Sequence, residues 1–310
     1  MKILIAGTGG VGGYFGGRLA NAGQDVTFIA RGAHKEAMEK DRLEVKSING
    51  DFAVKPVKVT DKISESDTPD LVVISVKAWQ VKDIAKKLKP VIGEHTMVLP
   101  LQNGVLASDE LKEILPAHNV LSGLCRIISK IDGPGKINHL AVDPTIVFGE
   151  CDNSKSRRVL DLEKTFNESG FKGRVAQDIQ ADLWRKFISI CVSGFLAVTR
   201  ATYGEVREQK ETRQMMRDLF EEIVSLANAL KINIEADFVD KTMAFIDTFP
   251  YDSTSSLTRD VWEGKLSELE YQNGTVVKLA EKAGVDVPIN RFVYYSLLLM
   301  EKRARRKYHQ

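Results

Sequence analysis

The chain has 310 residues, with 44 lysines and arginines against 42 aspartates and glutamates and a formal net charge of +2. This length predicts two domains that each bury a core, and the near balance of charge gives no reason to expect a nucleic acid as partner. Three cysteines without C-x-x-C spacing, no apolar run of about 18 residues and no targeting segment predict a cytoplasmic protein without a disulfide framework, a metal site or a membrane span.

The first predicted elements are a strand, a glycine-rich loop and a helix. Residues 2–6 form a short apolar run that predicts a buried parallel strand, and residues 25–29 predict a second one. Between them, six residues match G-x-G-x-x-G: Gly7, Thr8, Gly9, Gly10, Val11 and Gly12. This motif between a strand and a helix is typical of a dinucleotide site, where glycines let the backbone approach a pyrophosphate. A merely glycine-rich turn is the weaker alternative.

Arg31 follows the second predicted strand, at the place where NAD-binding proteins usually carry an acidic residue. A guanidinium suits a ribose 2′-phosphate through charge-assisted hydrogen bonds, whereas a carboxylate would repel that phosphate. The sequence therefore predicts NADP(H) rather than NAD(H) as cofactor. A surface arginine near a turn is the alternative.

Two more predicted strands, at residues 70–76 and 96–101, come directly before Lys77 and Asn103. In a doubly wound sheet the ligand lies beyond the carboxyl ends of the strands, so both side chains are placed to touch it. The structural alternatives are a lysine at a helix entry and an Asn-Gly turn.

The pattern becomes helical after residue 178. Residues 145–149 predict a last strand of the sheet and residues 171–176 one more, so we place a domain boundary near residue 175. A further helix is predicted over residues 211–230, with one apolar face formed by Met215, Leu219, Ile223, Leu226 and Leu230. The motif Val-Pro-Ile at residues 287–289 introduces a final helix.

A long uncharged segment begins at Phe187 and ends at Thr199, which predicts a helix buried on nearly every side. Lys186 stands at its head, either as a solvated helix end or as a cation aimed into a pocket. Ser255 or Ser256 predicts the start of another helix.

The next helix start is predicted from the S-x-x-E spacing of Ser267 and Glu270, which matches a capping box. Glu268 then falls in a first helical turn, where a carboxylate is favourable without any function.

Together these motifs resemble the ketopantoate reductase (2-dehydropantoate 2-reductase) family over nearly the whole chain. The matching pieces are GTGGVG at 7–12, Arg31, VKAWQV around Lys77, QNG at Asn103, LWRK ending at Lys186, and SSLTRD…SELEYQNG at 255–274. The resemblance implies an α/β fold, with an N-terminal Rossmann-type doubly wound sheet in residues 1–175, a C-terminal all-helical domain in residues 176–310, and a cleft between them. It leaves a homodimer open.

The resemblance implies NADPH-dependent reduction of 2-dehydropantoate to (R)-pantoate, a step of pantothenate and coenzyme A biosynthesis. The residues implied to hold NADP(H) are Gly7, Thr8, Gly9, Gly10, Val11, Gly12, Arg31, Lys77, Asn103 and Glu268.

The same resemblance assigns the catalytic roles to Lys186, as general acid, and to Glu268, while Lys186, Ser256 and Asn103 would contact the small 2-oxo acid. An ammonium suits the first role because hydride addition to a carbonyl leaves charge on oxygen, which a nearby cation stabilises and protonates.

Four positions depart from the family pattern, in which the lysine usually begins K-x-x-x-N-x-x-x-N. Ile190 and Gly194 replace those two asparagines, and Tyr203 and Ser253 replace two others. Each lost amide can cost a polar substrate about 1–3 kcal/mol of binding. The sequence therefore keeps two alternatives open: a related enzyme for a more apolar 2-oxo acid, and an NADP(H)-binding sensor without turnover.

Overall fold

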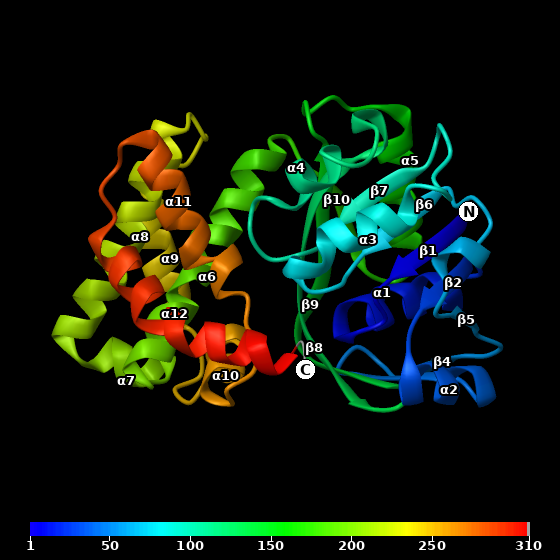
Figure 1. The fold of residues 1–310 in the computed structure, drawn as a ribbon, viewed down its shortest axis with the longest axis horizontal. Coiled ribbons are helices and arrows are strands. Elements are labelled where there is room, and N and C mark those ends of the chain that lie inside the picture. Colours follow the sequence, from blue (N-terminus) through cyan, green and yellow to red (C-terminus); the bar gives the residue numbers. More distant parts are fainter. Residues whose placement is uncertain (309–310) are drawn as a thin grey trace. The chain divides into compact units, whose positions relative to one another are not determined.

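The computed structural model describes residues 1–308, which form two compact units (Figure 1). Unit 1 contains Met1–Gln102 and Leu106–Ile179. Unit 2 contains the short segment Asn103–Val105 and the chain from Gln180 onward. The chain thus enters unit 2 twice, first for three residues and then again from Gln180.

A five-stranded parallel sheet in the order β5-β2-β1-β6-β7 forms the centre of unit 1 (Figure 1). Its strands are β1 (Lys2–Ala6), β2 (Asp25–Ile29), β5 (Lys58–Thr60), β6 (Leu71–Ile74) and β7 (Met97–Pro100). Every residue of β6 and β7 is buried, as expected for strands covered on both faces. This order and parallel pairing confirm the predicted Rossmann-type sheet.

A second sheet in unit 1 was not predicted. Its order is β10-β9-β3-β4, with β8 paired to β9, and its strands are β3 (Leu43–Ser47), β4 (Phe52–Val54), β8 (Leu121–Gly133), β9 (Lys136–Glu150) and β10 (Lys172–Val175). Residues 145–149 therefore end β9 of this sheet, and the prediction that they complete the parallel sheet was wrong. The strand predicted at 171–176 is β10, which pairs with β9 in parallel.

The helices of unit 1 include α1, which lies between the two sheets. A side chain at Gly16 would meet Ile5 and Phe28 of the first sheet at 2.7 Å, and one at Gly13 would meet Ile137 of the second at 2.7 Å. Glycines are needed here because α1 packs closely on both sides. The helical elements are α1 (Gly10–Asn21), α2 (Gly32–Lys40), α3 (Val81–Leu88), α4 (Ala107–Lys112) and α5 (Arg157–Glu168), with short 3₁₀ turns η1 (Ile63–Glu65), η2 (Ala78–Gln80) and η3 (Ala117–Asn119).

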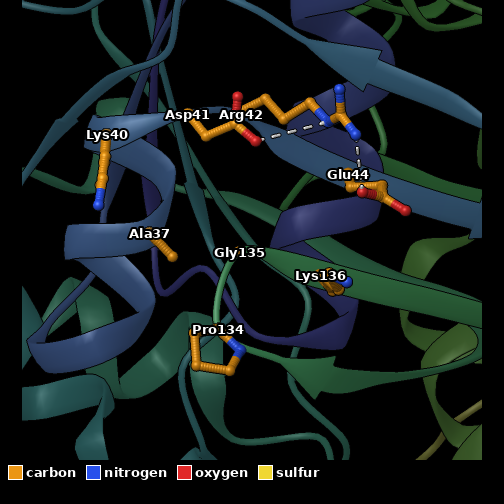
Figure 2. Close-up of a pocket in the computed structure, with 8 residues that line it drawn as sticks. All are labelled: Ala37, Lys40, Asp41, Arg42, Glu44, Pro134, Gly135 and Lys136. Atoms are coloured by element: carbon orange, nitrogen blue, oxygen red, sulfur yellow. Dashed lines mark hydrogen bonds and ion pairs between the residues drawn. The ribbon is translucent and has the colours of Figure 1, made fainter.

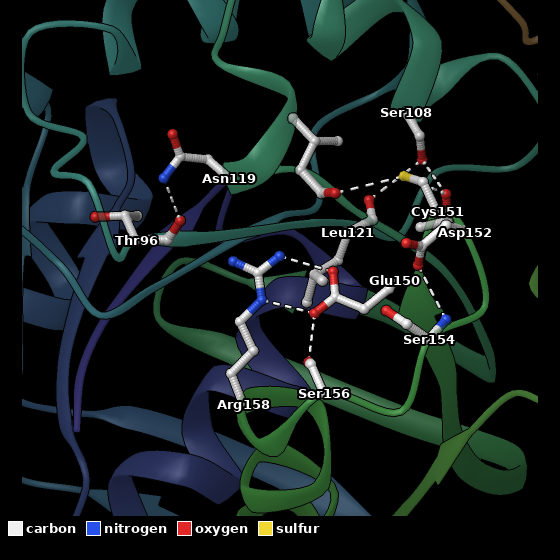
Figure 3. Close-up of polar contacts among 12 residues, drawn as sticks. Thr96, Ser108, Asn119, Leu121, Glu150, Cys151, Asp152, Ser154, Ser156 and Arg158 are labelled. Atoms are coloured by element: carbon white, nitrogen blue, oxygen red, sulfur yellow. Dashed lines mark hydrogen bonds and ion pairs between the residues drawn. The ribbon is translucent and has the colours of Figure 1, made fainter.

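A half-buried ion pair fixes the start of α5 to the end of β9 (Figure 3). The Glu150 carboxylate accepts hydrogen bonds from Nε and Nη2 of Arg158, each at 2.7 Å, and from Oγ of Ser156 at 2.5 Å. Burial alone would raise the pKa of Glu150, but these hydrogen bonds outweigh it and hold the pKa below its ordinary value. The pair therefore stays charged and holds this corner of unit 1 at neutral pH.

Unit 2 consists of helices, with no strand among its described residues, as predicted for the C-terminal part. They are α6 (Ile179–Thr199), α7 (Tyr203–Glu208), α8 (Lys210–Ala229), α9 (Phe238–Asp247), α10 (Ser256–Trp262), η4 (Leu269–Tyr271), α11 (Asn273–Ala283) and α12 (Pro288–Tyr308). Phe187, Ile188 and Phe195 of α6 are at most 1% exposed and pack with residues of α8 such as Phe220 and Ile223 in one core. Within the described residues, none of the helices has the length and hydropathy of a membrane span.

The buried face of α8 differs from the prediction at both ends. Leu219, Ile223 and Leu226 are fully buried as expected, but Met216 occupies the first buried position and Met215 is only partly buried. Leu230 is 36% exposed because α8 ends at Ala229 and Leu230 is its C-cap.

Candidate active site

The glycine-rich loop between β1 and α1 is held in a conformation that requires glycine at two positions. Gly7 has a φ of 107°, and a Cβ there would lie 2.8 Å from the backbone nitrogen of Val76. A Cβ at Gly12 would lie 2.1 Å from the Gly7 carbonyl oxygen and 2.2 Å from Oγ of Ser75. Ser75 donates to that same carbonyl at 2.7 Å. The loop is therefore packed against the carboxyl end of β6.

Gly9, in contrast, faces open space. A Cβ there would meet nothing within 4 Å, whereas one at Gly10 would lie 2.4 Å from the carbonyl oxygen of Ser129 in β8. Gly9 is the N-cap of α1 and gives the helix no side-chain cap, and Val11 follows in the first turn. Open space beside uncapped N–H groups at a helix N-terminus suits a phosphate group. The loop therefore fits the pyrophosphate of a dinucleotide.

Thr8 ties this loop to the end of β2, which Arg31 follows in the chain. The Thr8 side chain is buried, and its hydroxyl donates to the carbonyl oxygen of Ile29 at 2.9 Å. Arg31 is the exposed N-cap residue of α2, directly beyond β2. Among residues 1–308 its guanidinium has no hydrogen-bond or ion-pair partner, so it can accept an anion.

The end of β6 carries Lys77, which is exposed at the start of η2. Its ammonium lies 5.8 Å from the centroid of the Trp79 ring, and its backbone N–H donates to Oε1 of Gln80 at 3.2 Å.

Gln102 braces this strand end, and the sequence did not single it out. Its side-chain amide donates to the carbonyl oxygens of Ile74 at 3.0 Å and Val76 at 2.9 Å, while its Oε1 is buried and accepts no hydrogen bond within the described residues.

In unit 2 the structure brings together two predicted site residues that are 165 positions apart in the sequence. Nδ2 of Asn103 donates to Oε2 of Glu268 at 3.0 Å. The neighbouring Gly104 has a φ of 99°, and a Cβ there would lie 2.8 Å from the carbonyl oxygen of Tyr271. The Asn103–Val105 segment therefore packs directly on the turn that carries Glu268, which is 7% exposed.

The predicted capping box at Ser267 was wrong. Oγ of Ser267 accepts from the backbone N–H of Leu269 rather than from that of Glu270, and α11 begins only at Asn273. Glu268 precedes the short 3₁₀ turn η4 and does not lie in the first turn of an α-helix. The helix dipole therefore does not account for a buried carboxylate at this position.

Lys186 is a half-buried residue of α6, which is long and apolar as predicted. Ile190, one turn further, is half-buried, and Gly194, two turns further, is buried. A Cβ at Gly194 would lie 2.3 Å from Oδ1 of Asn273, a fully buried side chain of α11. The space of the family's second asparagine is thus taken by a neighbouring helix.

The helix start near Ser256 resolves one alternative. Ser255 is the N-cap of α10, and its Oγ accepts from the backbone N–H of Thr258 at 3.1 Å. Ser256 is the first residue of the helix and is exposed. Its hydroxyl is therefore not needed for the cap.

Tyr203 and Ser253, the other two departures from the family pattern, contribute to the protein's own structure. Tyr203 is 6% exposed and packs edge-on against Phe249, and burial raises the pKa of its phenol. Oγ of Ser253 donates to the carbonyl oxygen of Pro250 at 2.6 Å, and the Ser253 carbonyl accepts from the backbone N–H of Tyr203 at 3.1 Å.

A pocket of about 480 Å³ opens elsewhere on unit 1, between the end of α2 and the β8–β9 turn (Figure 2). Its lining residues are Ala37, Lys40, Asp41, Arg42, Glu44, Pro134, Gly135 and Lys136. None of the predicted site residues lines it. Figure 2 shows Arg42 between the carboxylates of Asp41 and Glu44. The Arg42 guanidinium lies 3.9 Å from the Asp41 carboxylate and 3.3 Å from that of Glu44, so these three wall charges pair with one another.

Comparison with known proteins finds matches along both units. The model of the family "Ketopantoate reductase PanE/ApbA" matches residues 3–153, and the model of its C-terminal domain matches residues 178–301. The 2-dehydropantoate 2-reductase of Aquifex aeolicus is 31% identical over 94% of each chain. An uncharacterized oxidoreductase of Bacillus subtilis, YkpB, is 29% identical over 97% of this chain and 99% of its own.

Among solved structures, a PanE/ApbA family ketopantoate reductase from Ralstonia eutropha JMP134 matches with a TM-score of 0.90. It is 29% identical, and the match covers 98% of this chain and all of that one. The motifs, the two-part fold and these matches agree, and the chain belongs to the ketopantoate reductase family.

Proposed function

We propose that the protein reduces a 2-oxo acid to the 2-hydroxy acid with NADPH, and that 2-dehydropantoate, giving (R)-pantoate, is its substrate. The observation that carries the proposal is that the chain keeps both halves of the family's motif set. Unit 1 has the glycine loop with its open phosphate position, and unit 2 has Lys186 together with the Asn103–Glu268 contact. Support comes also from the 2-dehydropantoate 2-reductases among the relatives.

The geometry of unit 1 supports a set of residues that would hold NADP(H). The N–H groups beyond Gly9 would bind the pyrophosphate, and Arg31 would bind the 2′-phosphate as a charge-assisted pair. Lys77 adds a second cation at the neighbouring strand end. When bound, the nicotinamide supplies the hydride.

The residues of unit 2 would act on the acid. Lys186 would stand beside the carbonyl oxygen, stabilise the negative charge that forms there and donate a proton to it. The exposed hydroxyl of Ser256 would bind the substrate carboxylate. Asn103 and Glu268 would contact the bound acid together, since the hydrogen bond between them already restricts the orientation of both side chains.

A more apolar 2-oxo acid is the second candidate substrate. It is favoured by Ile190, which presents a hydrocarbon side chain where the family usually has an amide. Gly194 also favours it. The space that a side chain at this position would need is taken by the amide of Asn273, and that side chain is fully buried. The pocket would therefore offer a polar substrate fewer hydrogen-bond partners.

NADPH oxidation with a panel of 2-oxo acids tests these proposals. We expect 2-dehydropantoate to give the highest kcat/KM, against 2-oxoisovalerate and bulkier apolar analogues. A clear preference for the bulkier acids would instead support the second candidate. If NADPH binds but no acid is turned over, the protein is a nucleotide-binding sensor and both reductase proposals fall.

Replacing Arg31 with aspartate is expected to weaken NADPH binding by about 10- to 100-fold, because it removes a charge-assisted pair of about 1.5–3 kcal/mol and adds repulsion. NADH, which lacks the 2′-phosphate, should lose little affinity. Titration of the nucleotide fluorescence gives both dissociation constants. Arg42→Ala, which changes an arginine beyond the same helix, serves as the control and should alter neither. Equal losses for the two nucleotides would contradict the 2′-phosphate role.

A further inference from the structure

The turn that carries Glu268 is bonded to the C-terminal helix α12. Ser267 is fully buried, and its backbone N–H and its hydroxyl both donate to Oε2 of Glu301, at 3.2 and 2.7 Å. Oγ of Ser267 in turn accepts from the backbone N–H of Leu269 at 3.2 Å. These three hydrogen bonds fix the chain on both sides of Glu268.

Glu301 carries a carboxyl group at a buried position of α12. It is 5% exposed, and burial raises the pKa of its carboxyl group. Its other oxygen lies 3.8 Å from the guanidinium of Arg305, one turn further along α12. A buried carboxylate is costly unless its hydrogen bonds and charge partners compensate, and here both donors of Ser267 do so.

A second contact joins the same turn to the same face of α12. The Tyr294 hydroxyl donates to Oε2 of Glu270 at 2.6 Å. Tyr294 and Glu301 are seven residues apart, which places them two turns apart on one face of the helix. The chain is therefore held to α12 just before and just after Glu268.

We propose that Glu301 is a positioning residue for Glu268, because its hold on Ser267 sets the turn from which Glu268 reaches Asn103. The inference rests on the proposed role of Glu268 in the reaction. It makes α12, whose residues were not among the predicted site residues, part of the support of the active site.

Two substitutions at Glu301 separate its hydrogen bonds from its charge. Glutamine keeps one oxygen that can accept from both donors of Ser267, whereas leucine keeps none. We expect Glu301→Leu to lower kcat/KM by about 10- to 100-fold, as displaced catalytic groups do. Glu301→Gln should retain most of it. Equal losses in the two variants would contradict positioning by hydrogen bonds.

A double-mutant cycle with Glu268→Ala tests whether Glu301 acts through Glu268. If it does, Glu301→Leu should cause little further loss of kcat/KM in the Glu268→Ala protein, because the two changes remove one function. A loss as large as in the parent protein would show that Glu301 only supports the fold, and would overturn the proposal.

Amide hydrogen exchange of the unliganded protein tests whether Glu301 holds the turn at Ser267, without relying on activity. Glu301→Leu should accelerate exchange at Ser267 and Leu269, and Glu301→Gln should not. Ser267→Ala, a smaller change, should accelerate exchange at Leu269 even if Glu301→Leu fails to fold. Glu281→Leu, at an exposed position of α11, is the matched control and should change neither exchange nor kcat/KM.

The two proposals fail in different ways. Unchanged exchange at the Ser267 and Leu269 amides in the Glu301 and Ser267 variants would overturn the proposed positioning role of Glu301, whatever the activity. A parent protein without turnover on any 2-oxo acid would overturn the proposed function. The exchange result would still decide whether Glu301 holds the turn at Ser267.

Discussion

Replacing Lys186 with alanine is expected to lower kcat by about 10²- to 10⁴-fold, the usual contribution of a general acid, while NADPH affinity stays nearly unchanged. NADPH affinity should be unchanged because Lys186 lies in α6 of unit 2, whereas the glycine loop and Arg31, which would bind the nucleotide, lie in unit 1. Single-turnover oxidation of NADPH, with the best acid from the panel, measures the chemical step. Fluorescence titration measures the nucleotide affinity.

Arg185 provides a matched control, since it is an adjacent cation on the same helix. Its guanidinium is held by Glu235 at 2.7 Å and Asp182 at 3.4 Å, so its charge is engaged in the fold. Arg185→Ala should therefore leave kcat near that of the parent. A Lys186→Ala protein that keeps kcat within about tenfold would contradict the general-acid role.

Lys186→Arg separates charge from proton donation. Arginine keeps the positive charge, but its guanidinium stays protonated near neutral pH and is a poor acid. We expect KM for the acid to recover toward that of the parent while kcat stays low. Recovery of kcat as well would mean that Lys186 stabilises charge without donating the proton.

The Rossmann-type sheet could be predicted because its signals are local. The run at 25–29 coincides with β2 (Asp25–Ile29), and that at 2–6 coincides with β1 (Lys2–Ala6). Buried parallel strands are continuous apolar runs, and the glycine motif marks the turn that follows the first of them.

The second sheet could not be predicted, because its pairing is distant and its faces are uneven. β3 pairs with β9 about 90 residues further along the chain, which no local pattern records. The β8–β9 hairpin has register shifts, and Ile128 and Leu140 on it are almost half exposed, so the apolar alternation is broken.

The candidate site shows the same division between local and distant information. The motif positions, such as Lys186 and Asn103, could be named from the sequence. The contacts that support the turn carrying Glu268 could not, because Glu301 follows Ser267 by 34 residues and nothing in the sequence near either residue indicates the contact. The S-x-x-E spacing predicts a capping box at Ser267 because a sequence pattern records only partners a few residues away, whereas the actual partner of Ser267 is the distant Glu301.

Replacing Gly194 with asparagine, which restores the family's usual residue, is expected to destabilise this protein. A Cβ there would lie 2.3 Å from Oδ1 of Asn273 and 2.7 Å from Cγ1 of Val293. Asn273 cannot easily move, because its Nδ2 donates to the Cys191 carbonyl and to Oδ1 of Asn290, each at 3.0 Å. Overpacking and a second buried amide together should cost about 2–6 kcal/mol of unfolding free energy. Chemical denaturation of the apo protein measures this loss.

Two further variants test why the glycine is there. Ile190→Asn restores the other family asparagine at a half-buried position, so it should cost far less stability and should raise kcat/KM for 2-dehydropantoate relative to apolar acids. Gly194→Ala should cost less in an Asn273→Ala background, because the oxygen that a new Cβ would meet is gone. Equal costs in the two backgrounds would show that Asn273 does not impose the glycine. A lower cost in the Asn273→Ala background would instead show that the departure from the family motif at Gly194 is a packing requirement of α11 against α6. Ile190 would then be the departure to test for an effect on substrate preference.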